Sequence, residues 1–193
     1  VCRKLRLDII ARGADSVPYM VAGSGPGGYD NIIMGPTDRV PDPGDILIID
    51  TGARYDGYFC DFDRNFAFGT PTDAARRAHA AVWQATEAGF AAARPGVTTS
   101  ELCAVMWTVL EEAGALSNDV GRLGHGLGTR LTEWPSLRPG DDTVLTPGMV
   151  ITLEPGMEFA PGKLMVHEEN IVIRDGQAEM LSTRAPAELP IIS

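Results

Sequence analysis

The sequence predicts an α+β fold built from two similar halves. The first observation is an internal repeat: in residues 40–52 and 144–156, Pro-Gly begins an apolar run that ends at a carboxylate. The second is the Asp56-Gly57 pair between two apolar runs, a strong signal for a β-hairpin. The third is helix-patterned sequence between the two halves. A chain of 193 residues is long enough for one domain, so we expect residues 1–193 to form a single domain.

The first half begins with basic, helix-like sequence. We expect this helix to end within residues 9–15, with Gly13 at its C-cap, and a long loop to follow. Two strands, residues 46–53 and 58–68, then form the hairpin around Asp56-Gly57.

Two helices are predicted between the halves. Residues 72–93 are rich in alanine, and Arg94-Pro95-Gly96 separates them from the next helix. Thr98 and Glu101 have the spacing of a capping box, and apolar residues follow at helical intervals. We assign these apolar stripes to the hydrophobic core.

The second half repeats the order of the first. A helix ends near Gly114, and the acidic residues Glu154 and Glu168 lie on two strands joined by residues 155–165. Similar halves commonly pack about a pseudo-two-fold axis, so we expect the acidic strand ends of both halves to meet.

The register of the predicted hairpin places two carboxylates on one face of the sheet. If the turn centres on Asp56-Gly57, then Asp61 lies opposite Gly52, and Asp50 is one diagonal step away. Glu154 and Glu168 repeat this arrangement. Each acid alone could be a solvated edge residue, but four converging carboxylates repel one another and favour a bound cation.

Among the three histidines, His125 has the setting of a ligand because glycines surround it in Gly124-His125-Gly126-Leu127-Gly128. Imidazole is the commonest nitrogen ligand for catalytic transition metals. We assign His79, within a helix, and His167, on the strand face opposite Glu168, to structural roles.

Composition excludes several classes of function. The formal net charge of -10 argues against nucleic-acid binding, and the apolar runs are far shorter than a membrane span. Three cysteines without a framework spacing suggest no disulfide and a reducing, cytoplasmic setting. The chain begins with Val1 and shows no apolar segment of a signal peptide, so we expect it to be a fragment whose N-terminal portion is missing.

The motifs together resemble the pita-bread metallopeptidase superfamily of methionine aminopeptidase, Xaa-Pro aminopeptidase, prolidase and creatinase. The likeness is closest to the Xaa-Pro peptidase branch and spans nearly the whole chain. It is carried by Ile49-Asp50-Thr51-Gly52, Gly57-Tyr58-Phe59-Cys60-Asp61, residues 124–128, Leu153-Glu154-Pro155-Gly156 and residues 167–173. The resemblance implies that residues 1–193 are a C-terminal catalytic domain with a pita-bread fold, in which a curved, mainly antiparallel sheet is covered by helices on its outer face.

The resemblance also implies a dinuclear metal site. Its ligands would be Asp50, Asp61, His125, Glu154 and Glu168, with Asp61 and Glu168 bridging the ions. The implied cofactors are two divalent ions, manganese first, with cobalt, iron or zinc as alternatives. In the implied hydrolysis the ions activate a water molecule that attacks a carbonyl carbon, while Glu154 also transfers the proton. We expect catalytic roles for Glu154 and His125, and a homodimer for the full-length protein.

Four positions depart from the family's pattern. Thr132 and Ile33 stand where the peptidase branch has histidines, Val166 replaces an arginine, and Asp63 replaces a threonine. We expect Tyr29, Ile33 and Thr132 to contact substrate, with Asp30, Asn31 and Trp134 as further candidates. Loss of donors that stabilise a tetrahedral intermediate raises a barrier. Two alternatives to an Xaa-Pro peptidase therefore stay open: a creatinase-like hydrolase or lyase for a small non-peptide metabolite, and a catalytically silent binding module.

Overall fold

The computed structural model describes residues 1–117 and 121–192, which contain three helices and eleven strands. In chain order they are α1 (Cys2–Ala11), β1 (Ser16–Pro26), β2 (Asp45–Tyr55), β3 (Tyr58–Phe68), α2 (Asp73–Ala92), α3 (Thr99–Glu112), β4 (His125–Gly126), β5 (Glu133–Ser136), β6 (Val150–Leu153), β7 (Gly156–Ala160), β8 (Lys163–Val166), β9 (Glu169–Val172), β10 (Glu179–Met180) and β11 (Ile191–Ile192). In the described ranges, none of these helices has the length and apolarity to cross a bilayer.

The three strands of the first half and β11, from the last residues described, form a four-stranded sheet in the order β1-β2-β3-β11. The predicted hairpin register is confirmed, with Tyr55 opposite Tyr58 and Gly52 opposite Asp61. Asp56 and Gly57 both have positive φ values, 48° and 83°, the backbone that a tight hairpin turn requires. Helix α1 packs its apolar side on one face of β1 and β2.

One sequence prediction for the first half is wrong. The segment expected to be a long loop contains β1, which pairs antiparallel with β2 along most of its length. Glycine and proline weaken the strand pattern here, but pairing with β2 and burial of Val17, Met20 and Ala22 supply the stability that local propensity lacks.

The second half forms a five-stranded antiparallel sheet in the order β10-β9-β6-β4-β5. The connection predicted over residues 155–165 is itself a hairpin, β7-β8, rather than a plain loop. The expectation of mainly antiparallel strands is confirmed, since β11 with β3 is the one parallel pair in the described part of the chain. The strands divide among three sheets rather than forming one.

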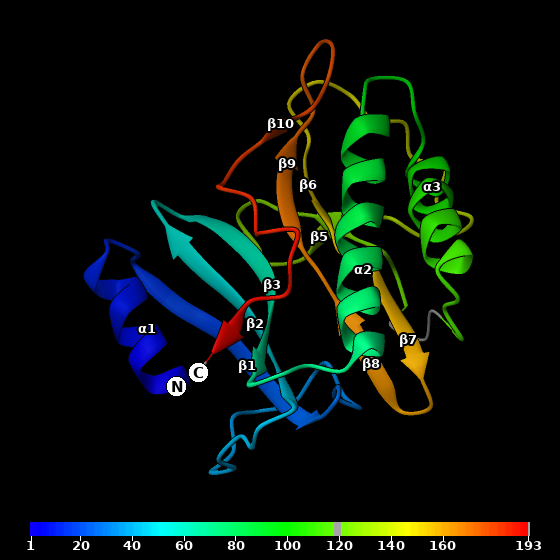
Figure 1. The fold of residues 1–193 in the computed structure, drawn as a ribbon. Helices are drawn as coiled ribbons and strands as arrows, with labels where there is room; N and C mark the ends of the chain where they lie inside the picture. Colours follow the sequence, from blue (N-terminus) through cyan, green and yellow to red (C-terminus); the bar gives the residue numbers. More distant parts are fainter. Residues whose placement is uncertain (118–120, 193) are drawn as a thin grey trace.

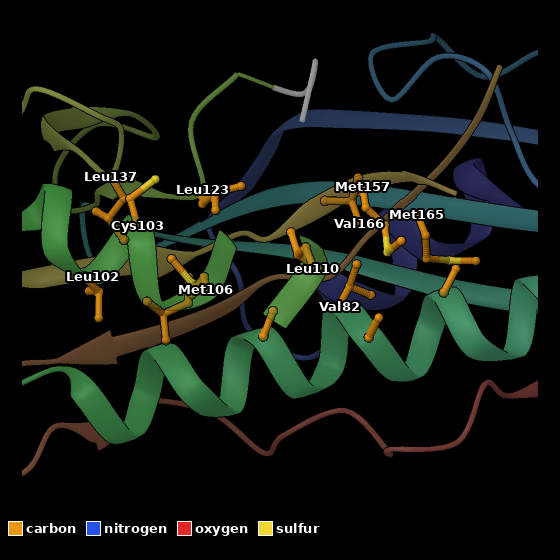
Figure 2. Packing of buried hydrophobic residues seen from close by; sticks show 14 of the residues in the cluster. Val82, Leu102, Cys103, Met106, Leu110, Leu123, Leu137, Met157, Met165 and Val166 are labelled. Carbon is orange, nitrogen blue, oxygen red and sulfur yellow. The ribbon is translucent and has the colours of Figure 1, made fainter. Parts of the chain in front are cut away.

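The two predicted central helices are confirmed, with α2 starting after its N-cap Thr72. Thr98 and Glu101 form the predicted capping box at the start of α3. Helices α2 and α3 lie side by side against the strands of the second half (Figure 1). Leu102, Met106 and Leu110 of α3 point into a core shared with Val82 of α2 and Met157 of β7 (Figure 2).

The two halves meet where β3 contacts β8 and β9. On β3, the face that carries Asp61, Asp63 and Asn65 is buried there, whereas Phe66 and Phe68 point to the α1 side. The acidic face of the first hairpin is therefore directed towards the second half of the chain.

Candidate metal centre

The acidic residues and the imidazole singled out in the sequence come from five different segments. Asp50 lies on β2, Asp61 on β3 and His125 on β4, while Glu154 follows β6 and Glu168 precedes β9. Ligand atoms of Asp61, His125 and Glu168 all lie within 4.8 Å of one another. A second group within the same limit consists of Asp50, Asp63 and Glu168, so Glu168 belongs to both.

The β2–β3 ladder fixes the two aspartates of the hairpin. Because Asp61 lies opposite Gly52, Asp50 is one step along the same face, and both carboxylates are directed to the junction of the halves. The Tyr19 hydroxyl, from β1, donates a hydrogen bond of 2.8 Å to Asp50 Oδ2. This contact fixes the orientation of the Asp50 carboxylate.

Asn170 and Arg64 lock the two halves together beside the carboxylates. The Asp61 backbone N–H donates to Asn170 Oδ1 at 2.9 Å, and the Asn170 amide donates back to the Asp61 carbonyl. Arg64 donates to the Glu168 carbonyl at 2.6 Å and to Glu169 Oε2 at 3.0 Å. These hydrogen bonds fix the backbone of Asp61 in the first half and of Glu168 in the second, and so fix the positions from which the two carboxylates extend.

His125 is oriented with one ring nitrogen free to bind. Its Nδ1 lies 2.8 Å from the Gly126 carbonyl oxygen, which can only accept, so Nδ1 carries the proton and Nε2 presents a lone pair. Nε2 is 3.7 Å from Asp61 Oδ2 and 3.9 Å from Glu168 Oε1. The glycines on either side are required, because a Cβ at Gly124 would lie 2.2 Å from the Thr152 carbonyl oxygen.

Burial dominates the electrostatics of this cluster. It raises the pKa of Asp50 to about 6 and, with the charges of Asp50 and Glu154, that of Asp61 to about 8. Burial also raises the pKa of Glu154 to about 7 and that of Glu168 well above its ordinary value. Burial lowers the pKa of His125 to about 4, which keeps the imidazole neutral at pH 7.

These residues fit a bound cation. Asp61 Oδ1 and Glu168 Oε1 are buried and have no hydrogen-bond partner among the described residues. A buried carboxylate oxygen without a donor is costly, and a divalent cation would satisfy it and relieve the repulsion between the acids. The oxygen donors with one neutral imidazole suit manganese, iron, cobalt or zinc.

A cavity of about 700 Å³ opens over the cluster. Asp50, Asp61 and Glu154 form its acidic wall, and His125, Ile33 and Thr132 also line it. Tyr29 is placed elsewhere: it is 1 % exposed in the hydrophobic core, where its hydroxyl donates to Asn65 Oδ1 at 2.7 Å. The expected substrate contact of Tyr29 is therefore wrong: Gly28 packs closely against Phe159 and Lys163, and this packing holds Tyr29 in the core.

The remaining substrate candidates lie outside this cavity. Asp30 and Asn31 line a separate depression with Glu158, and Trp134 lines another with Arg130. His79 and His167 are both buried, with ring centroids 6.3 Å apart, and His167 Nε2 lies 3.4 Å from Glu169 Oε1. Neither belongs to the two groups of candidate ligands.

Three residues of the site were not predicted. Tyr19 required the pairing of β1 with β2, which the sequence did not indicate. Asp63 was noted only as a departure from a pattern, although the parity of β3 already places it on the same face as Asp61. Arg122 lines the cavity and donates to the Thr132 hydroxyl at 3.3 Å; its nearness to the glycine-flanked His125 was the available signal.

The family model described as metallopeptidase family M24 matches residues 1–175. The chain is 37% identical over 185 residues to a probable dipeptidase PepE of Mycobacterium tuberculosis, which covers 95% of this chain and 49% of that relative. It is 37% identical over 145 residues to an Xaa-Pro dipeptidase of Lactobacillus helveticus, which covers 74% of this chain and 39% of that relative. The chain thus spans about half the length of the curated relatives it matches.

Solved structures agree with the sequence matches. The structure of dipeptidase PepE from Mycobacterium ulcerans matches with a TM-score of 0.90 at 32% identity, covering 98% of this chain and 51% of that one. The prolidase from Pyrococcus furiosus matches with a TM-score of 0.88 at 29% identity, covering 95% of this chain and 55% of that one. The pita-bread fold expected from the sequence is confirmed.

Proposed function

The chain belongs to metallopeptidase family M24, and on that premise we propose that it hydrolyses short Xaa-Pro peptides at a dinuclear metal site. The observation that carries this proposal is the convergence of Asp61, His125 and Glu168 beside an open cavity that Asp61 and His125 line, with two buried carboxylate oxygens that lack partners among the described residues. The relatives named as dipeptidases support a peptide substrate.

We assign the metal ligands to Asp50, Asp61, His125, Glu154 and Glu168. Divalent cations bound there would lower the pKa of a water molecule and stabilise negative charge on a carbonyl oxygen. Glu154 lines the cavity beside Asp50 and Asp61, so it would take the proton released by the water molecule and return it to the leaving amine. His125 stays neutral and contributes a nitrogen donor.

The cavity supports a small substrate with a free carboxylate. Its volume of about 700 Å³ is in the range of pockets for small ligands. Arg122 and Arg138 line the same cavity as the acidic wall, so positive charge lies within reach of the cluster. A dipeptide could place its scissile carbonyl at the carboxylates and its C-terminal carboxylate towards these guanidinium groups.

A second candidate is a hydrolase or lyase for a small non-peptide metabolite. The observation in its favour is that Ile33, 68 % exposed, and Thr132 both line the cavity and can supply no imidazole to a peptide intermediate. An enzyme of this kind would use the same cations on a different carbonyl or leaving group.

A peptidase assay separates the candidates. The purified chain is incubated with Mn²⁺ and a panel of Xaa-Pro dipeptides, dipeptides without proline, and tripeptides. We expect Mn²⁺-dependent cleavage of Xaa-Pro dipeptides, its loss in Glu154→Gln, and its retention in Glu158→Gln, a matched change on β7 outside the cavity lining. Absence of cleavage with metal bound would favour the metabolite enzyme, and a folded protein without metal would favour a silent binding module or a metal-free enzyme.

A further inference from the structure

Asp63 is a buried acid of the cluster that lies outside the predicted ligand set. It lies directly opposite Asp50 in the β2–β3 ladder, so both side chains share the face that carries Asp61. Only 2 % of Asp63 is exposed to solvent. Two aspartates facing each other across antiparallel strands repel and destabilise the sheet unless something neutralises them.

Glu168 completes a three-carboxylate group with this pair. Each of Asp50, Asp63 and Glu168 offers an oxygen within 4.8 Å of the others. Glu168 comes from the second half of the chain, is 1 % exposed, and has its Oε1 buried without a hydrogen-bond partner in the described part of the chain. An unsatisfied buried oxygen beside two further carboxylates is the arrangement that a hard cation would satisfy.

The guanidinium of Arg64 lies near the three carboxylates, but its hydrogen bonds go to other groups. Its guanidinium donates to the backbone carbonyls of Asp63 and Glu168 and to the Glu169 carboxylate. Arg64 therefore positions the backbone of the cluster without neutralising its three side chains.

The two groups of candidate ligands differ in chemistry. Asp61, His125 and Glu168 combine oxygen with an imidazole nitrogen, whereas Asp50, Asp63 and Glu168 are all oxygen donors. Imidazole suits zinc and cobalt, whereas an all-carboxylate set favours manganese or magnesium. Glu168 is the residue that the two groups share.

We propose that Asp63 is an additional metal ligand, so that one ion of the pair lies in an all-carboxylate set (Asp50, Asp63 and Glu168) and the other in a set containing His125. This inference rests on the metal site of the proposed function and deepens it. It assigns the two positions unlike preferences, with Mn²⁺ or Mg²⁺ favoured at the first and Zn²⁺ or Co²⁺ favoured at the second.

Asp63→Asn tests the proposal, because the amide keeps the shape of the side chain and removes its charge. Mn²⁺ binding to the metal-free protein is measured by titration calorimetry. We expect the wild-type chain to bind two Mn²⁺ ions and Asp63→Asn to weaken one of them by about tenfold or more, leaving the other unchanged. His125→Ala should weaken the other ion.

Thermal unfolding supplies a readout independent of activity. In the metal-free protein the Asp63 carboxylate repels its acidic neighbours, so Asp63→Asn should raise the melting temperature measured in chelator. In the metal-loaded protein the same carboxylate binds the ion, so Asp63→Asn should reduce the increase in melting temperature that Mn²⁺ produces. Asp45→Asn is the matched control, since Asp45 is buried at the far end of β2 and pairs with Arg39. It should lower both melting temperatures alike and leave Mn²⁺ binding unchanged.

Two outcomes overturn the proposal. One is a folded Asp63→Asn protein whose two Mn²⁺ affinities both stay within about twofold of wild type. The other is a melting temperature that falls equally with and without Mn²⁺, the behaviour of a purely structural residue. If the wild-type protein binds no Mn²⁺, the proposed function is contradicted as well. If Asp63→Asn selectively weakens one Mn²⁺ ion but the wild-type protein has no peptidase activity, Asp63 is supported as a ligand and only the proposed function is contradicted.

Discussion

Gly126 allows β4 to approach the neighbouring strand closely enough to present His125 to the carboxylates. A Cβ at this position would lie 2.2 Å from the Trp134 carbonyl oxygen, which is backbone and cannot move aside easily. Glycine is therefore required at position 126 for steric reasons, because any side chain there would push β4, and with it His125, away from the neighbouring strand.

We predict that Gly126→Ala displaces β4, lowers the free energy of unfolding by about 1–3 kcal/mol, and weakens metal binding through His125. Chemical denaturation and metal titration measure the two effects. Gly35→Ala is the matched control, because a Cβ there meets no atom within 4 Å. Unchanged stability and metal affinity in Gly126→Ala would show that the close approach is not required.

At the scale of single residues, the sequence predicted side chains whose direction follows from strand parity. Asp50 and Asp61 could be placed because an Asp-Gly turn sets the register of the hairpin. Tyr29 could not, because its direction depends on long-range partners, Asn65 and Val166, that no local pattern reveals. Asp63 obeys the same parity as Asp61, but its contact with Glu168 depends on how the two halves pack.

The start of α3 depends on a reciprocal cap. Glu101 N–H donates to Thr98 Oγ1 at 3.2 Å, and Thr98 N–H donates to Glu101 Oε2 at 2.8 Å. These bonds satisfy backbone and side-chain groups that would otherwise lack partners at the helix end.

We predict that Thr98→Ala lowers the free energy of unfolding by about 1 kcal/mol, because the N-cap acceptor is lost. Thr108→Ala, the same change inside α3, removes only a bond to the Ala104 carbonyl and improves helix propensity, so it should be neutral or stabilising. Equal effects of the two substitutions in urea denaturation would contradict the capping role.

At the scale of elements, helices and the first hairpin could be predicted because their signals are local: caps, turn residues and apolar spacing. Strand β1 could not, because its sequence gains stability from pairing with β2 rather than from its own alternation. Residues 155–165 were predicted only as a longer connection between two strands, because the pairing of β7 with β8 was not indicated by an alternating pattern.

His79 links α2 to the segment before β9. It is 2 % exposed, and burial followed by the charge of His167 lowers its pKa to about 4. The unfolded chain therefore takes up a proton at higher pH than the folded chain does. Between pH 6.5 and 4, stability contributed by neutral His79 is lost as the pH falls.

We predict that, from pH 6.5 to 5, wild-type protein loses on the order of 2 kcal/mol more stability than His79→Leu. Denaturation at each pH, compared between the two proteins, isolates this histidine from the carboxylates that titrate in both. Gln84→Leu on the exposed side of α2 should keep the wild-type profile. Parallel pH profiles for wild type and His79→Leu would contradict the assignment.

At the scale of the whole molecule, the internal repeat was the most informative signal. It predicted that acidic strand ends from both halves would meet, and the structure brings Asp61 of the first half beside Glu168 of the second. The division of the strands into three sheets and the clamp between Asn170 and Asp61 could not be predicted, because both arise from packing between distant segments.

Metal content tests the central claim most directly. Protein purified without chelator, then loaded with Mn²⁺ and desalted, is analysed for bound metal in wild type, Asp61→Ala and Thr132→His. We predict two ions per chain in wild type and in Thr132→His, which changes only the cavity wall, and loss of metal in Asp61→Ala. Retention of both ions by folded Asp61→Ala would contradict the assignment of this carboxylate cluster as the metal centre.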